Sequence, residues 1–495
     1  MDDVSNSGTE NECELDTEFI ANESAEGGHR RRWRWKRSSA SYSAAPRDRG
    51  YVVYVCMVLA GAGFLFPWSS YITAIDYFFF LYRRDFPQVS VAIPMTYLVS
   101  TWIFTGVNVS LVTAVPLHAR IGLGYVLFLL SLIAIPFIDL MVHSCVLSIH
   151  AAYYLTIFSI AVVGVGSGVQ QSSYYGLAGM LPPRYPQAVM VGESVATSIV
   201  SITRVITKSS TTSERFGAIA FFVVSVFFIL VCVGCQQIIR SSSFVKSHTL
   251  QCRQSSEHDK GGGEMERVSD GEEEAGDQLK LLPVDTKQSS VKAKIKAGLL
   301  LRWGVVVEIW QLLVAVFVSF FLTLLLFPGL VSLVQYCPTG DWTPILLVAV
   351  FNVPELIAKW VALLPLRWSS TGLMTGALLR FLLVPPILLL VSPSPSQPVI
   401  SSGTLVWAIL LVALLGFSSG YFGSLPMIVF SRQVKNAQHL ELAGTIMTYS
   451  LLTGLMLGSV LAYSLTPLTS IASHSPCSSN VTELFNSCSP NATYL

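Results

Sequence analysis

The sequence has little charge for its length. Only 12% of its 495 residues are Asp, Glu, Lys or Arg, whereas 52% are hydrophobic. Ordinary soluble domains carry about 25% charged residues, so this composition is that of a membrane protein with many spans. The charges are confined to the N-terminal segment, one central segment and short turns. The net charge of +1 marks no basic nucleic-acid-binding surface, and we expect no nucleic-acid partner.

The chain also lacks the motifs of nucleotide and metal chemistry. It contains no Walker motif, no G-x-G-x-x-G between a strand and a helix, and no clustered His, Cys and Glu residues. We therefore expect no cofactor, no metal and no enzymatic activity. The nine cysteines are scattered, and the C-x-x-C of Cys232 and Cys235 lies in an apolar run, where we expect it to pack rather than to bind a metal.

Long apolar runs dominate the rest of the sequence. A membrane span needs about 20 predominantly apolar residues, and we predict eleven such helices, which makes the fold an all-α polytopic membrane protein. The predicted spans are Tyr51–Thr73, Ala92–Val115, Ile121–Val142, Ala151–Tyr175, Ala188–Lys208, Phe216–Ile239, Trp303–Leu326, Pro344–Leu364, Leu373–Val391, Leu405–Val429 and Leu440–Leu465.

Polar stretches divide the chain into five parts. We predict a disordered cytosolic N-terminal tail, a first transmembrane half with six helices, a disordered cytosolic linker, a second transmembrane half with five helices, and an extracellular tail. Most Lys and Arg residues fall in the tail, the linker and alternate loops, which places the N-terminus inside and, with an odd number of spans, the C-terminus outside. The five ranges are 1–50, 51–239, 240–302, 303–465 and 466–495.

The C-terminal tail fits an extracellular location. It contains no Lys or Arg, and Asn480 and Asn491 each begin an N-x-T sequon. We expect these two asparagines as glycosylation sites. Cys477 and Cys488 lie in the same polar tail and are candidates for a disulfide.

The stretch 187–208 combines membrane-spanning length with buried charge. It carries Glu193 near its middle and Arg204 further along. A charge at mid-bilayer costs about 2.5 to 3.5 kcal/mol, so such residues face a protein interior or a water-filled cavity. On an ideal helix Glu193, Thr197, Ser201 and Arg204 form one polar stripe. We predict that Glu193 binds substrate and that Arg204 is a structural or gating charge.

Further charges recur in the other spans. Glu355 and Lys359 are four residues apart in the favourable order for an ion pair, with Asn352 one turn earlier. We predict these three as substrate-binding residues, although a purely structural ion pair is the alternative. Arg380 and Asp139 have no partner on their own helices, so we expect them to pair across helices or to reach an interface, as structural or gating charges.

Two further regions are candidates for the substrate pocket. The range 166–176 puts Gln170, Gln171, Ser172 and Ser173 at membrane depth, where they either bond neighbouring helices or contact a polar solute. Trp68 follows a glycine- and proline-containing break in the first span. We predict Gln170 and Trp68 as pocket members.

Several motifs resemble the equilibrative nucleoside transporter family over nearly all of the membrane portion. Within that family, VGESVATSIVSITRVITK is most similar to the plasma membrane monoamine transporter branch. The resemblance implies a six-plus-five pseudo-symmetric, major-facilitator-like bundle that rocks around a central site. The motifs are FPWSSYITAIDYF (66–78), YYGLAGMLPPRY (174–185), FNVPELIAK (351–359), GYFGSLPM (420–427) and ELAGTIMTYSLLTGLMLGS (441–459).

This resemblance also implies a function. From the resemblance we expect a sodium-independent facilitative carrier in the plasma membrane. It would transport monoamines such as serotonin and dopamine and other organic cations, and acidic pH would favour this transport. Nucleoside-selective members have a neutral residue, commonly Gln, at the position of Glu193, and a carboxylate there would attract an ammonium group. The alternative is an equilibrative carrier of adenosine or uridine, in which Glu355 and Lys359 hold ribose. A receptor or scaffold that transports nothing is a third hypothesis, and proton coupling stays open.

Overall fold

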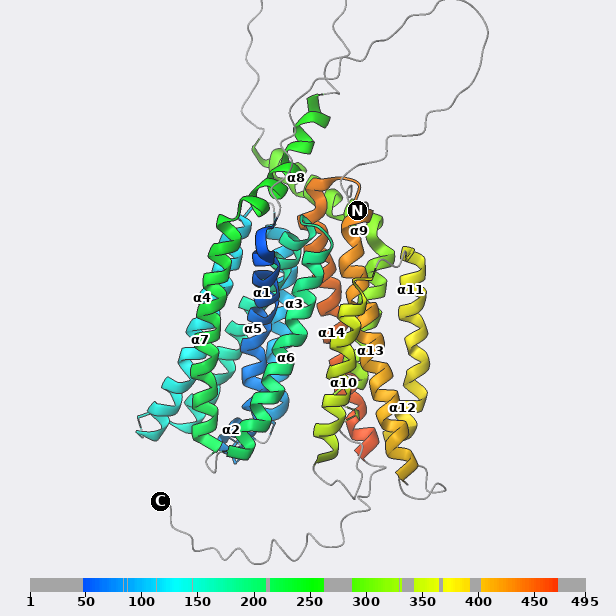
Figure 1. Cartoon of the computed structure of the whole chain (residues 1–495). Helices are drawn as coiled ribbons and strands as arrows, with labels where there is room; N and C mark the ends of the chain where they lie inside the picture. Colours follow the sequence, from blue (N-terminus) through cyan, green and yellow to red (C-terminus); the bar gives the residue numbers. More distant parts are fainter. Residues whose placement is uncertain are drawn as a thin grey trace, which may run out of the picture. The chain divides into compact units, whose positions relative to one another are not determined.

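The computed structural model describes residues 48–470, apart from residues 83, 87, 113, 145, 211–213, 262–286, 329, 332–341, 365–367 and 392–401. Across this part of the chain the regular structure is helical, without a strand (Figure 1). A helix satisfies its backbone hydrogen bonds internally, as a lipid environment demands, and the all-α class is confirmed. The two sequons, Cys477, Cys488 and nearly all of the predicted N-terminal tail lie outside the described residues.

The described residues form a series of helices along the chain. The first half of the chain contains η1 (Arg49–Tyr51), α1 (Val52–Thr73), α2 (Ile75–Tyr82), α3 (Val89–Leu111), α4 (Leu117–His143), α5 (Ile149–Gly179), α6 (Arg184–Ser210) and α7 (Glu214–Ser241). After these come α8 (Ser243–Gly261), α9 (Lys287–Leu326), α10 (Trp342–Val361), α11 (Ser370–Leu379), η3 (Arg380–Leu383), α12 (Val384–Val391), α13 (Ser402–Gln433), η4 (Ala437–His439) and α14 (Leu440–Ser470).

Eight helical segments within the described residues are long and apolar enough to cross a membrane. They correspond to eight of the predicted spans, while the other three correspond to α3, α6 and α10. The stripe of polar and charged residues on α6 lowers its hydropathy below that of its neighbours. The class of multi-pass membrane protein is therefore confirmed, and the count of eleven stays a prediction.

Glycines at the helix crossings allow the helices of each half to pack closely together. A Cβ atom on Gly61 of α1 would overlap the backbone of Val189 in α6. In the second half, a Cβ atom on Gly420 of α13 would overlap the backbone of Glu355 in α10. Such small-residue contacts let helix backbones approach closely where lipid provides no hydrophobic drive for association. The two crossings therefore pack α6 closely against α1, and α10 closely against α13.

The two sets of helices meet along α14, α5 and α3. Gly444 of α14 lies against the backbone of Tyr175 in α5. The indole nitrogen of Trp102 in α3 donates to the hydroxyl of Thr453 in α14, with a distance of 3.1 Å. Contacts between α6 and α10 and between α6 and α13 complete this interface. The helices that carry Glu193 and Lys359 are therefore neighbours.

The prediction of a disordered linker over 240–302 is corrected for part of its length. Residues 243–261 form α8, and α9 begins at Lys287. Phe244 and Val245 of α8 are buried, and the Phe244 ring packs on Tyr185 with a centroid distance of 5.2 Å. The helix also contacts η4, which joins α13 to α14. The polar composition of the segment hid this helix, because only a few apolar residues anchor it.

Candidate substrate-binding site

Glu193 is a buried carboxylate held by two neutral donors. Its side chain lies in the first half of α6, and the residue is 8% exposed. The amide of Gln171 and the hydroxyl of Tyr175, both in α5, donate to Glu193 Oε1 at 3.0 and 2.9 Å. Hydrogen bonds to an ionised acceptor are about twice as strong as neutral ones. Both of these donors reach Oε1.

Aromatic rings accompany this carboxylate. Trp68 of α1 stacks on Tyr97 of α3, with ring centroids 4.0 Å apart. The Tyr97 hydroxyl lies 2.8 Å from the Ser167 hydroxyl oxygen and within electrostatic range of Glu193. Aromatic faces attract cations, so this pair adds a suitable surface beside a carboxylate. A role of Trp68 in the pocket stays a prediction, and sequence reasoning did not single out its stacking partner Tyr97.

The predicted ion pair in α10 is confirmed. Lys359 Nζ lies 3.1 Å from Glu355 Oε1, and the Lys359 side chain is only 4% exposed. The backbone carbonyl of Lys359 accepts a hydrogen bond from the Gln187 amide of α6 at 3.3 Å. Across this contact, Lys359 attracts the charge of Glu193 and Glu355 repels it. The structure therefore brings together Glu193, Glu355 and Lys359 from both halves. Asn352 lies half-buried one turn before Glu355.

The hydrogen-bond acceptors around Arg380 are neutral groups. It is buried, and its guanidinium donates to Ser319 O at 2.7 Å, Thr323 Oγ1 at 3.0 Å and Ser418 Oγ at 3.1 Å. These acceptors belong to α9 and α13, which confirms pairing across helices, but with neutral groups. Among the described residues no carboxylate lies within ion-pair distance of Arg380, and Glu355 attracts it at longer range.

Gln171, and not Gln170, faces Glu193. The Gln170 amide donates to the backbone carbonyl of Ile121 in α4 at 3.3 Å, and its stem packs against Gly124. Consecutive helical residues point about 100° apart, so only one of the two glutamines can face α6. The structure therefore places the Gln170 side chain against α4 and not beside Glu193, an arrangement that a single sequence does not give because it does not contain the rotation of α5. A role of Gln170 in the pocket stays a prediction.

The other two predicted charges have separate surroundings. Asp139 of α4 is buried and accepts a hydrogen bond from the Tyr77 hydroxyl of α2. That contact joins neighbouring helices and agrees with a structural role. Arg204 belongs to α6, but its side chain lies outside the described residues.

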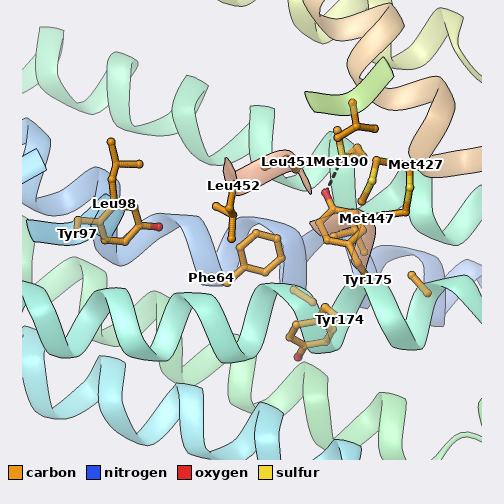
Figure 2. Close-up of a cluster of buried hydrophobic side chains, with 14 of the residues drawn as sticks. Phe64, Tyr97, Leu98, Tyr174, Tyr175, Met190, Met427, Met447, Leu451 and Leu452 are labelled. Atoms are coloured by element: carbon orange, nitrogen blue, oxygen red, sulfur yellow. Dashed lines mark hydrogen bonds between the residues drawn. The ribbon is translucent and has the colours of Figure 1, made fainter. Parts of the chain in front are cut away.

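A wall of methionine and aromatic side chains adjoins the Tyr175 hydroxyl. Figure 2 shows Tyr175 close to Met190 of α6, Met427 of α13 and Met447 of α14. All four side chains are buried. They form a buried apolar surround for Tyr175, which is one of the two donors to Glu193.

A second ion pair joins the two halves where α4 and α14 begin. Arg120 of α4 pairs with Glu441 of α14. The Arg120 guanidinium also donates to Asn108 Oδ1 and Ser173 Oγ, each at 3.3 Å. Sequence reasoning placed Arg120 in the loop before one predicted span and Glu441 at the start of another, and it missed the pair. The one available signal was that each residue lies at the start of an apolar run.

These features define a class of protein. A helical bundle with buried charges from two halves around one centre is the architecture of a membrane transporter. Within the described residues, no group of three or more His, Cys, Asp and Glu side chains is arranged to hold a metal.

Comparison with solved structures identifies the fold. The fold is similar to the proton:xylose symporter of the major facilitator superfamily bound to 6-bromo-6-deoxy-D-glucose, with a TM-score of 0.53 and 12% identity over 85% of this chain and 96% of that one. It is also similar to a bacterial homologue of the iron transporter ferroportin, with a TM-score of 0.55 and 12% identity over 85% and 92% of the two chains. These similarities establish a major-facilitator-like fold.

The family follows from sequence comparison. A family model described as nucleoside transporter matches residues 157–466. "Equilibrative nucleoside transporter 4" of Homo sapiens is 36% identical over 465 residues, which cover 87% of this chain and 86% of the relative. The Danio rerio protein of the same name is 34% identical over 468 residues, covering 89% and 88%. The chain belongs to the nucleoside transporter family. It is a multi-pass facilitative transporter of a small molecule and not an enzyme.

Proposed function

We propose that this transporter carries monoamines and other organic cations, such as serotonin and dopamine, without sodium. The observation that supports this is the buried carboxylate of Glu193, which neutral donors hold in place. A buried carboxylate whose hydrogen-bond donors are neutral favours a cationic solute, because an approaching positive charge offsets part of the cost of its desolvation.

The geometry suggests how the substrate is held. Its ammonium group meets Glu193 Oε2, while Gln171 and Tyr175 hold the other oxygen. The same ammonium group also lies near the faces of the stacked rings of Trp68 and Tyr97. Cation–π attraction adds about 0.5 to 2 kcal/mol to such binding. Asn352 and the pair of Glu355 with Lys359 form the wall contributed by the second half.

Transport proceeds by rocking of the two halves, 51–239 and 303–465, around this centre. The pair of Arg120 with Glu441 closes the end where α4 and α14 begin and separates when that end opens. From the distribution of Lys and Arg, we place this end in the cytosol, the C-terminus outside, and the protein in the plasma membrane.

Acid has opposite effects in two versions of the mechanism. If Glu193 must be ionised to bind substrate, strong acidification inhibits uptake. If Glu193 relays a proton during the cycle, acid stimulates uptake. Serotonin uptake between about pH 8 and about pH 5.5 at clamped membrane potential separates the two versions, and a flat profile removes protons from the mechanism.

The test is uptake of radiolabelled serotonin and uridine in cells that express wild type, Glu193→Gln or Glu193→Asp at matched surface levels. We expect Glu193→Gln to lose serotonin uptake and to retain or gain uridine uptake, while Glu193→Asp keeps part of the serotonin uptake. Unchanged serotonin uptake in Glu193→Gln would contradict the proposal.

A nucleoside carrier is the second candidate function. Two observations favour it: the names of the relatives, and the exposed edge of Glu355 beside Lys359, which can bind ribose hydroxyls. Uridine uptake by the wild type that serotonin does not inhibit would support this candidate over the first.

A further inference from the structure

The charges of Glu193, Lys359, Glu355 and Arg380 alternate in sign, and all but the partly buried Glu355 are buried. Glu193 of α6 is attracted by Lys359 of α10, which pairs at 3.1 Å with Glu355, which in turn attracts Arg380 of η3. Lys359, Arg380 and Glu193 are each less than one-tenth exposed. One charge comes from the first half and three from the second.

Within this set the second half has one positive charge more than it has negative charge. Glu355 is a single carboxylate between the two cations Lys359 and Arg380. Burial of a charge without an opposite partner is costly, so the excess positive charge favours the proximity of Glu193. The side chain best placed for this role is Lys359, because its backbone already contacts α6 through Gln187 at 3.3 Å.

We propose that, in the empty carrier, the ammonium group of Lys359 interacts with Glu193 and neutralises its charge. The ammonium group of a substrate then displaces Lys359. This inference rests on the proposed function, because it needs a cationic substrate at Glu193. Glu355 has the complementary role of holding Lys359 when the substrate is bound.

The side-chain chemistry suits such an exchange. Lysine carries a compact charge on a flexible four-carbon stem, and Lys359 starts from a position bonded to Glu355. Competition between Lys359 and the substrate lowers apparent affinity by the fraction of carriers in which Glu193 is already neutralised. The empty carrier therefore need not expose an uncompensated carboxylate while its halves move.

The inference predicts opposite effects for two neighbouring substitutions. Lys359→Gln removes the competitor, so the half-saturating concentration of serotonin should fall about tenfold, as expected for one charge interaction at a site of intermediate dielectric. Glu355→Gln frees Lys359 to engage Glu193, so the same concentration should rise several-fold. The double variant should behave like Lys359→Gln, since Glu355 acts through Lys359.

The experiment measures initial rates of serotonin uptake against concentration in cells with matched surface expression. Lys359→Arg keeps the positive charge at this position, so its half-saturating concentration should shift less than that of Lys359→Gln. General damage to the site would raise the half-saturating concentration in both single variants, and that result overturns the inference. If only one variant reaches the surface, a shift opposite to its expected direction overturns it equally.

Failure of the proposed function gives a different result. Absence of serotonin uptake by the wild type, or unchanged uptake by Glu193→Gln, removes the cation site itself. A normal response of Glu193→Gln together with equal shifts in Lys359→Gln and Glu355→Gln rejects only the role of Lys359.

Discussion

The two ion pairs of the membrane region differ in what they connect. Arg120 and Glu441 belong to different halves of the molecule, whereas Glu355 and Lys359 lie one turn apart on the same helix. Relative movement of the halves must break the first pair and leaves the second intact. A pair between halves can therefore act as a gate, and a pair within one helix can travel with the substrate site. The role of each pair therefore depends on whether it joins the two halves, and not on burial alone.

The largest expected effect comes from breaking the pair between halves. Glu441→Gln leaves the buried Arg120 guanidinium without its carboxylate, which costs about 3 to 5 kcal/mol in comparable buried pairs. We expect a clear loss of thermal stability in detergent, measured by fluorescence-detected size-exclusion chromatography after heating. Glu355→Gln should cost less, because Lys359 retains the attraction of Glu193.

A double substitution tests whether this effect belongs to the pair. Arg120→Gln with Glu441→Gln should recover much of the stability lost in Glu441→Gln, because neither charge then stays buried alone. Additive losses in the double variant would show that the two side chains act independently, and the comparison of the two pairs would fail.

A smaller effect is expected from the donors around Glu193. Gln171→Ala removes a hydrogen bond to a charged acceptor, which is worth about 1.5 to 3 kcal/mol. We expect the half-saturating concentration of serotonin to rise about tenfold or more. Gln170→Ala is the matched control on the same helix and should leave that concentration near the wild-type value. Equal effects of both substitutions would mean that α5 is merely destabilised.

The aromatic pair should have a weaker influence than the hydrogen bonds. Trp68→Ala removes the ring that stacks on Tyr97, and we expect serotonin to bind several-fold more weakly because about 1 kcal/mol of cation–π attraction is lost. Trp68→Phe keeps an aromatic face and should retain most of the affinity. If the affinity for an aliphatic organic cation falls as much in Trp68→Ala as the affinity for serotonin, the result supports the cation–π origin. An unchanged affinity for the aliphatic cation contradicts it.

The smallest effect concerns α8. Phe244→Ala removes the ring packed on Tyr185, and we expect α8 to lose on the order of 1 kcal/mol of docking free energy. Limited proteolysis in detergent should then cleave α8 faster, while the stability of the bundle changes little. The neighbouring Lys246→Ala is the control and should not alter the cleavage rate. A drop in bundle stability equal to that of Glu441→Gln would be the contrary result.

The sequence by itself determined the features that depend on local order along the chain. Apolar runs predicted the helices, because each span must satisfy its own backbone in lipid. The spacing of Glu355 and Lys359 predicted their ion pair, since residues four apart share one helix face. The charge of Glu193 inside an apolar run identified it as a residue with a partner or a ligand.

Only the tertiary structure decided which side chains meet across helices. The choice of Gln171 over Gln170 depends on the rotation of α5, and the neutral acceptors of Arg380 depend on how α9 and α13 cross. Arg120 and Glu441 are separated by most of the chain, so no local pattern relates them. Helix rotation and crossing are set by packing between distant segments, and a single sequence contains no local signal for them.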